Sequence, residues 1–194
     1  MGDFGEGARE FDAGRAAADD GKVQQSAADG GVADRLRIDA AAALRTAGDL
    51  DGAVAAVDAV VGTGPETLGR AEAIRARVCW SSGDPEGMRA AIERGLAPVA
   101  GHGSVAEAML RAEAVVVTAL VDGHFEQGLE DATTAIALAE ASGADLIRPL
   151  LLRATILTGL GLPGWTEALE RVMDAAREAG DPETELSAAN NLVA

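Results

Sequence analysis

The chain has 194 residues, and 32 aspartates and glutamates against 16 lysines and arginines give it a formal net charge of −16. This charge argues against direct contact of the chain with nucleic acid or with an anionic membrane surface. The single cysteine, Cys79, excludes an internal disulfide and a multi-cysteine metal site.

Helix signals dominate the sequence, whereas no alternating run bounded by hairpin turns indicates a strand. Ser104 and Asp181 are typical helix N-caps, and glycines such as Gly48 and Gly143 are typical of helix ends. Apolar or small residues at three- and four-residue spacing predict helices over Asp34–Ala47, Leu50–Val61, Thr67–Ser81, Glu86–Pro98, Val105–Val121, Phe125–Ala141, Asp145–Leu160, Thr166–Ala179 and Pro182–Ala194.

Several of the junctions between these helices share one pattern, a glycine followed by aspartate and an apolar residue. The pattern or a variant of it recurs at an interval of about 35 to 46 residues. It stands at Gly2-Asp3-Phe4, Gly48-Asp49-Leu50, Gly83-Asp84-Pro85 and Gly123-His124-Phe125, with a looser and longer version at Gly161-Leu162-Pro163-Gly164-Trp165.

The helix after each junction carries small or larger apolar residues at three positions, which lie five, nine and twelve residues after the junction glycine in all but the looser fifth unit. Small residues allow antiparallel helices to approach closely, and larger apolar residues fill the space between pairs. The positions hold Gly7, Phe11 and Gly14, then Ala53, Val57 and Val60, then Met88, Ile92 and Gly95, then Gly128, Ala132 and Ala135, and finally Ala168, Val172 and Ala175.

This register and the Gly-Asp-apolar junction resemble the tetratricopeptide repeat (TPR). Asn190-Asn191-Leu192-Val193 is also similar to the start of such a repeat, whereas the family's bulky residue early in the first helix and its signature proline are mostly missing. The resemblance implies an all-α fold, a right-handed superhelical solenoid of antiparallel helix pairs in which stacked neighbours form the core. A single compact helical bundle is the alternative.

The phase of the repeat predicts how the chain is organised. Residues 1–30 form a half-repeat (a second helix around Glu6–Asp19) and a linker. Residues 31–64, 65–103, 104–143 and 144–180 form four repeats, and 181–194 form the first helix of a truncated further repeat. We therefore expect the chain to be a piece of a longer array. The alternative is that the two terminal half-repeats themselves cap the ends of the array.

The alanine- and arginine-rich composition and repeat boundaries such as Ala175–Pro182 are similar to the helical arrays of large ATP-binding LuxR-type transcriptional regulators of actinobacteria. In that family a P-loop ATPase precedes the array and a helix-turn-helix domain follows it. Val23 follows Lys22 where a P-loop requires serine or threonine, so these residues are not a P-loop. The resemblance therefore implies a regulatory context without ATPase or DNA-reading activity in these residues.

In the resembled family, ligands lie in a groove lined by the first helix of each pair. Trp80 with Arg77 is the preferred anchor, because tryptophan and arginine dominate binding hot spots. The alternative is that groove aliphatics such as Val117, Leu120 and Leu157 belong to the core and that the groove arginines pair with neighbouring acidic residues. The groove positions that carry charge or the anchor are Arg35, Arg45, Arg70, Arg77, Trp80, Glu113 and Arg153.

No residues form a recognisable catalytic, metal or cofactor site. His102 and His124 have no ligand partners at a known spacing, and Cys79 has no adjacent histidine base. We therefore expect surface or turn histidines, an inert thiol, no metal and no cofactor.

The sequence therefore predicts a non-enzymatic module for protein–protein interaction, part of a larger regulator. Its partners are a protein or peptide, or neighbouring domains of a longer chain. One alternative is an effector-sensing array that binds a small molecule in its concave groove, and another is a helical-bundle enzyme. No window approaches 18 consecutive apolar residues and the N-terminus lacks a signal peptide's basic and apolar regions, so we expect a cytoplasmic protein that contacts no membrane.

Overall fold

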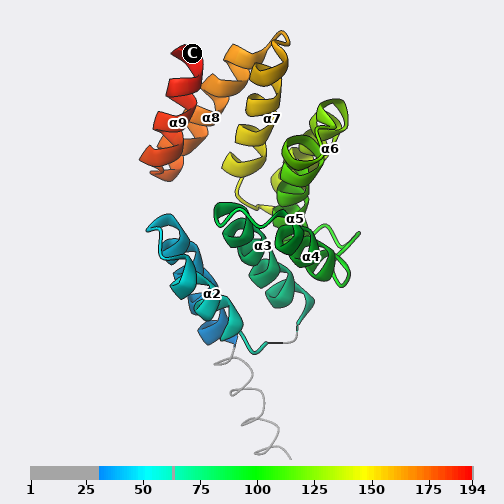
Figure 1. Cartoon of the computed structure of the whole chain (residues 1–194), viewed down its shortest axis with the longest axis vertical. Helices are drawn as coiled ribbons and strands as arrows, with labels where there is room; N and C mark the ends of the chain where they lie inside the picture. The colour runs from blue at the N-terminus through cyan, green and yellow to red at the C-terminus, as the bar shows by residue number, and fades with distance from the viewer. Residues whose placement is uncertain (1–30, 63, 194) are drawn as a thin grey trace, which may run out of the picture.

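Helices form all the regular structure of residues 31–62 and 64–193, which are the residues that the computed structural model describes (Figure 1). Residues 31–46 are helical, followed by α2 (Leu50–Asp58), α3 (Pro65–Ser81), α4 (Pro85–Leu96), α5 (Val105–Val115), η1 (Val116–Val121), α6 (Phe125–Ser142), α7 (Ile147–Leu160), α8 (Trp165–Ala179) and α9 (Pro182–Val193). The predicted all-α class is confirmed for this part of the chain. The predicted half-repeat over 1–30, with Gly7, Phe11 and Gly14, lies outside the described residues.

The predicted helix over Val105–Val121 is continuous, but its last part, η1, is a π-helix. The backbone N–H of Asp122 bonds to the carbonyl of Val117, and that of His124 bonds to the carbonyl of Thr118. β-branched side chains crowd an α-turn, so the wider π-turn is consistent with the valines of this segment.

At the Gly-Asp junctions that the structure describes, the glycine ends one helix and the aspartate caps the next. Gly48 and Gly83 adopt left-handed backbone angles, with φ of 82° and 74°, which end the preceding helix. The next residue caps the following helix: Asp49 Oδ1 accepts from the N–H of Gly52 at 2.9 Å, and Asp84 Oδ1 accepts from Gly87 at 2.8 Å. His124 occupies the aspartate position at the fourth junction, Gly123-His124-Phe125, and makes no such bond.

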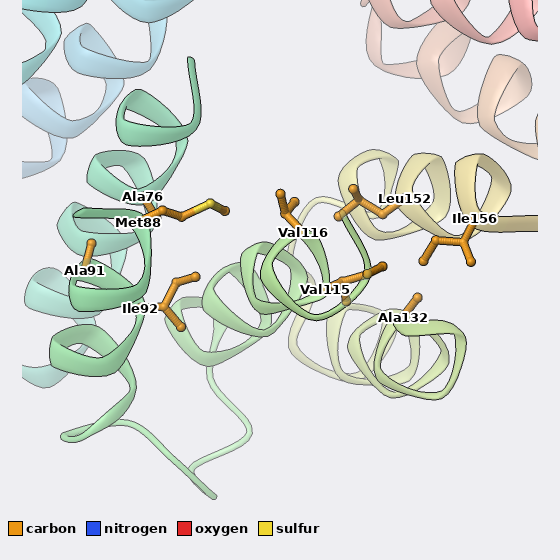
Figure 2. Close-up of a cluster of buried hydrophobic side chains, with 10 residues drawn as sticks. Ala76, Met88, Ala91, Ile92, Val115, Val116, Ala132, Leu152 and Ile156 are labelled. Atoms are coloured by element: carbon orange, nitrogen blue, oxygen red, sulfur yellow. The ribbon is translucent and has the colours of Figure 1, made fainter. Parts of the chain in front are cut away.

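Each helix packs against the next, and α3, α5, α7 and α9 also contact one another in sequence as alternate helices. The core is consequently divided into clusters along the chain. One joins helix 31–46 with α2 and α3, another joins α3 through α7, and a third joins α6 through α9. Figure 2 shows the central cluster, in which Met88 and Ile92 of α4 lie on the side of α4 that faces Val115 and Val116.

The predicted small and apolar positions are buried after the junctions at Gly48, Gly83 and Gly123. Val60 is the exception, because it is only half-buried. Ala53, Met88 and Ala132 are fully buried. A Cβ on Gly128 would lie 2.6 Å from Ala119 Cβ, so this position requires glycine for the close approach of α6 to η1.

The prediction for the fifth junction is wrong at two positions. Ala168 and Ala175 are only half-buried, and the neighbouring Leu169 and Ala176 are buried with Val172 instead. The junction is longer here, and Gly164 rather than Gly161 directly precedes the helix. The buried face of α8 is therefore shifted by one residue from the predicted positions Ala168 and Ala175.

No helix in residues 31–62 and 64–193 has the length and apolar character needed to cross a membrane.

Candidate functional site

A cavity of about 570 Å³ lies where four separate segments of the chain meet. The C-terminal ends of helix 31–46 and of α3 form one part of its wall. The first turns of α7 and α9, with the turns before them, form the other part. The lining residues are Arg45, Thr46, Arg77, Trp80, Ser81, Asp145, Ile147, Arg148, Leu151, Gly180, Asp181, Pro182, Thr184 and Ser187.

Three of the predicted groove residues, Arg45, Arg77 and Trp80, line this cavity together, and Glu113 is fully buried beside Arg77. The other three lie elsewhere: Arg35 is exposed on helix 31–46, Arg70 pairs with Glu66 on α3, and Arg153 is half-buried on α7.

The predicted groove aliphatics do not join the arginines at this cavity. Leu157 is buried and Val117 packs against the central cluster, so both belong to the core. Leu120 and Leu160 are each 39% exposed, and Leu160 lines a separate hollow with Phe125. The cavity's apolar surface comes instead from Trp80 and from residues of α7 and α9.

A buried carboxylate shared by two arginines forms the centre of the site. Glu113 Oε1 accepts hydrogen bonds from Nε of Arg77 at 2.6 Å and from Nε of Arg148 at 3.1 Å. Glu113 Oε2 accepts from Nη2 of Arg148 at 2.9 Å. Because Arg77 is on α3, Glu113 on α5 and Arg148 on α7, these bonds connect three alternate helices of the stack.

The ion pairs decide the protonation state of Glu113. Burial raises the pKa of this carboxyl, but the charges and hydrogen bonds of Arg148 and Arg77 outweigh burial and hold the pKa below its ordinary value of 4.5. A general acid or base works best with a pKa near the ambient pH. Glu113 is thus charged at neutral pH and positions the two arginines, and its lowered pKa does not suit proton transfer at that pH.

Both carboxylates on the cavity wall accept a hydrogen bond from a backbone N–H in the first turn of a helix. Asp145 Oδ1 accepts from the N–H of Ile147 at 2.9 Å at the start of α7, and Asp181 Oδ1 accepts from the N–H of Thr184 at 3.1 Å at the start of α9. A helix N-terminus carries partial positive charge, so each aspartate is partly compensated by the helix whose first turn it contacts. The capping role predicted for Asp181 is therefore observed.

Trp80 gives the cavity an exposed aromatic surface. Its side chain is 40% exposed at the end of α3, and Ser81 follows it on the same wall. Across the cavity lie Ile147, Leu151 and Pro182. The site therefore combines guanidinium donors with an apolar surface that water covers in the unbound chain.

The sequence analysis missed Arg148 and the residues from α9. The predicted groove positions on the fourth helix pair began at Arg153, so the first turn of α7 was not considered. One signal was available: Glu113 stands in a largely apolar helix and, if buried, needs a countercharge. The sequence predicts residues 181–194 only as a truncated repeat, although their first turn forms part of the cavity wall.

The histidines and the cysteine of the described residues do not line this cavity. His102 and His124 are exposed in turns, and Cys79 is half-buried on α3 with its pKa raised mainly by burial. A high thiol pKa disfavours the reactive thiolate. Within residues 31–62 and 64–193, no three histidine, cysteine or acidic side chains are grouped to hold a metal ion.

Comparisons of the chain with protein-family models, with curated proteins and with solved structures found no match.

Proposed function

We propose that this chain is a protein-interaction module that holds an extended segment of a partner protein in the cavity between helix 31–46, α3, α7 and α9. One observation carries the proposal. Arg45, Arg77, Arg148 and Trp80 come from three different helices and line the same cavity. Arginine and tryptophan are the residue types most enriched in binding hot spots.

The proposed architecture is a right-handed, TPR-like superhelix of antiparallel helix pairs. Contacts between the alternate helices α3, α5, α7 and α9 support it, because stacked helix pairs bring their first helices side by side. In that arrangement the cavity belongs to the face lined by first helices. The capped Gly-Asp junctions at Asp49 and Asp84 support a repeated structural unit.

The context that we propose is a larger cytoplasmic regulator in which this array receives a signal and has no enzymatic activity of its own. The basis is the resemblance of the repeat boundaries to those of the LuxR-type regulators. The net charge of −16 supports contact with protein rather than with nucleic acid.

A small-molecule effector is the second candidate occupant. The cavity volume of about 570 Å³ favours it, since pockets for small molecules commonly measure about 300–1,000 Å³. A peptide leaves this cavity at an open side, whereas an effector is contained within it. Competition between a selected peptide and small metabolites for the same site therefore separates the two.

Selection of random displayed peptides on the immobilised chain tests the proposal. Trp80→Ala is expected to weaken the selected peptides at least tenfold. Phe125→Ala is the matched control, because Phe125 is also 40% exposed but lines another hollow. Equal losses in the two variants, or failure to select any peptide, contradict the proposed peptide-binding function.

A further inference from the structure

The cations in the cavity wall are only partly neutralised by the carboxylate behind them. Arg77 and Arg148 line the cavity and bring two positive charges, whereas Glu113 brings one negative charge and is fully buried. A group inside the cavity therefore meets the guanidiniums before it meets the carboxylate. Charge at this part of the wall is positive, although the whole chain is acidic.

Both arginines retain hydrogen-bond donors after binding Glu113. Arg77 bonds to Glu113 through Nε, and Arg148 does so through Nε and Nη2. Both terminal nitrogens of Arg77 and Nη1 of Arg148 have no hydrogen-bond partner in the described residues. Side-chain exposures of 19% and 23% leave these guanidiniums accessible from the cavity. Guanidinium donors in this number suit an oxyanion, which accepts several hydrogen bonds side by side.

The remaining charges offset this preference in part. Burial lowers the pKa of Arg148, but Glu113 and Asp145 together raise it above its ordinary value. Arg45 adds a third cation to the wall, and the two aspartates, Asp145 and Asp181, bring the formal sum with Glu113 to zero. However, Asp145 and Asp181 bond to the N-termini of α7 and α9, whose positive ends compensate them in part.

Apolar surface lies beside these donors. Trp80 is 40% exposed, and Leu151 and Pro182 line the same space. Burial of such surface stabilises a complex by about 25 cal/mol for each Å² removed from water. A ligand with a carboxylate next to aliphatic or aromatic groups is thus complementary to both parts of the wall.

We propose that Arg77 and Arg148 form an oxyanion subsite that binds the side-chain carboxylate of an acidic residue flanked by apolar residues in the partner segment. This inference rests on the proposed peptide-binding function and names the chemistry of the bound segment. Glu113 is the positioning residue of the subsite, because it fixes both guanidiniums from behind.

Two peptides test the subsite directly: Leu-Glu-Leu-Leu-amide, whose N-terminus is blocked by a fluorescent dye, and its glutamine counterpart with the same dye. Both are titrated by fluorescence anisotropy. The Glu peptide is expected to bind at least tenfold more tightly than the Gln peptide. That preference is expected to fall below threefold in Arg148→Gln and to persist in Arg94→Gln. Arg94 is the control because it pairs with Glu72 away from the cavity. The comparison of the two peptides on the unaltered chain needs no variant and stands even if Arg148→Gln fails to fold.

Two further ligands identify the source of the carboxylate. The Gln peptide with a free C-terminus carries its carboxylate at the chain end, and N-acetyl-leucine carries the same chemistry in a small molecule. Both are expected to bind more weakly than the Glu peptide, and tighter binding by either overturns the assignment to an internal acidic residue.

The outcomes also separate this inference from the proposed function. Equal affinity for the Glu and Gln peptides, or a preference that survives in Arg148→Gln, overturns the oxyanion subsite alone if selected peptides still depend on Trp80. Absence of any peptide that depends on Trp80 overturns the proposed function.

Discussion

The substitution Glu113→Gln tests the structural role of the buried carboxylate. Glutamine has nearly the same volume, so the change removes charge without opening a cavity. It places an amide N–H₂, which donates, against a guanidinium N–H of Arg77 or Arg148, and it leaves one acceptor oxygen where Glu113 supplies two. Removal of one partner from a buried ion pair costs about 3–5 kcal/mol.

The partial exposure of the two arginines reduces this cost. At 19% and 23% exposure their guanidiniums regain some hydration, so we expect a loss of about 2–4 kcal/mol. For a chain of this size a loss of 1 kcal/mol lowers the melting temperature by about 2–4 °C, so the expected decrease is about 4–16 °C.

Urea unfolding followed by circular dichroism measures the effect. Glu140→Gln is the control, because Glu140 pairs with Arg171 at 2.9 Å while both side chains are about half exposed. An exposed pair of this kind contributes about 0–1 kcal/mol. A loss in Glu113→Gln that does not exceed the loss in Glu140→Gln refutes the structural role assigned to Glu113.

Three further predictions concern pH and packing. Because the pKa of Glu113 is lower in the folded chain than its ordinary value of 4.5, its contribution to stability is present above that value and is lost as the pH falls through the folded pKa. The fall in urea midpoint between about pH 7 and about pH 3.5 should therefore be smaller in Glu113→Gln than in the unaltered chain. An equal fall in both chains contradicts this assignment. Gly128→Ala should destabilise by about 1–3 kcal/mol, because its Cβ would lie 2.6 Å from Ala119 Cβ, whereas Gly159→Ala, which meets nothing within 4 Å, should stabilise α7 by about 0.5–1 kcal/mol in the same urea assay; the reverse order argues against the helix spacing described. Met88→Ala empties a fully buried position of the central cluster and should cost about 2–5 kcal/mol, and a loss below about 1 kcal/mol speaks against the packing in Figure 2.

Features set by short-range chemistry could be predicted from the sequence. Ser104 and Asp181 cap their helices as predicted, and Gly48 and Gly143 have the left-handed angles that end a helix. Most helix limits agree within two residues because caps and glycines act locally, whereas α2 ends at Asp58 and not at the predicted Val61.

Features set by long-range packing could not be predicted in the same way. Arg148 and Glu113 are 35 residues apart and meet only because α5 and α7 stack. The shift of the buried face to Leu169 and Ala176 depends on the exact entry of α8 after the longer junction. The sequence predicts one shared groove, whereas only Arg45, Arg77 and Trp80 of its predicted residues line the same cavity.

The two tryptophans of the chain allow the most direct test of the central claim, that the cavity beside Arg77 and Arg148 holds the partner segment. Trp80 lines the cavity, and Trp165 packs against the cluster of α6 through α9. In a ¹H–¹⁵N correlation spectrum, addition of the Glu peptide should shift the indole N–H signal of Trp80 and leave that of Trp165 in place. Binding of the peptide with no change at Trp80, or with a change at Trp165 alone, would contradict the account.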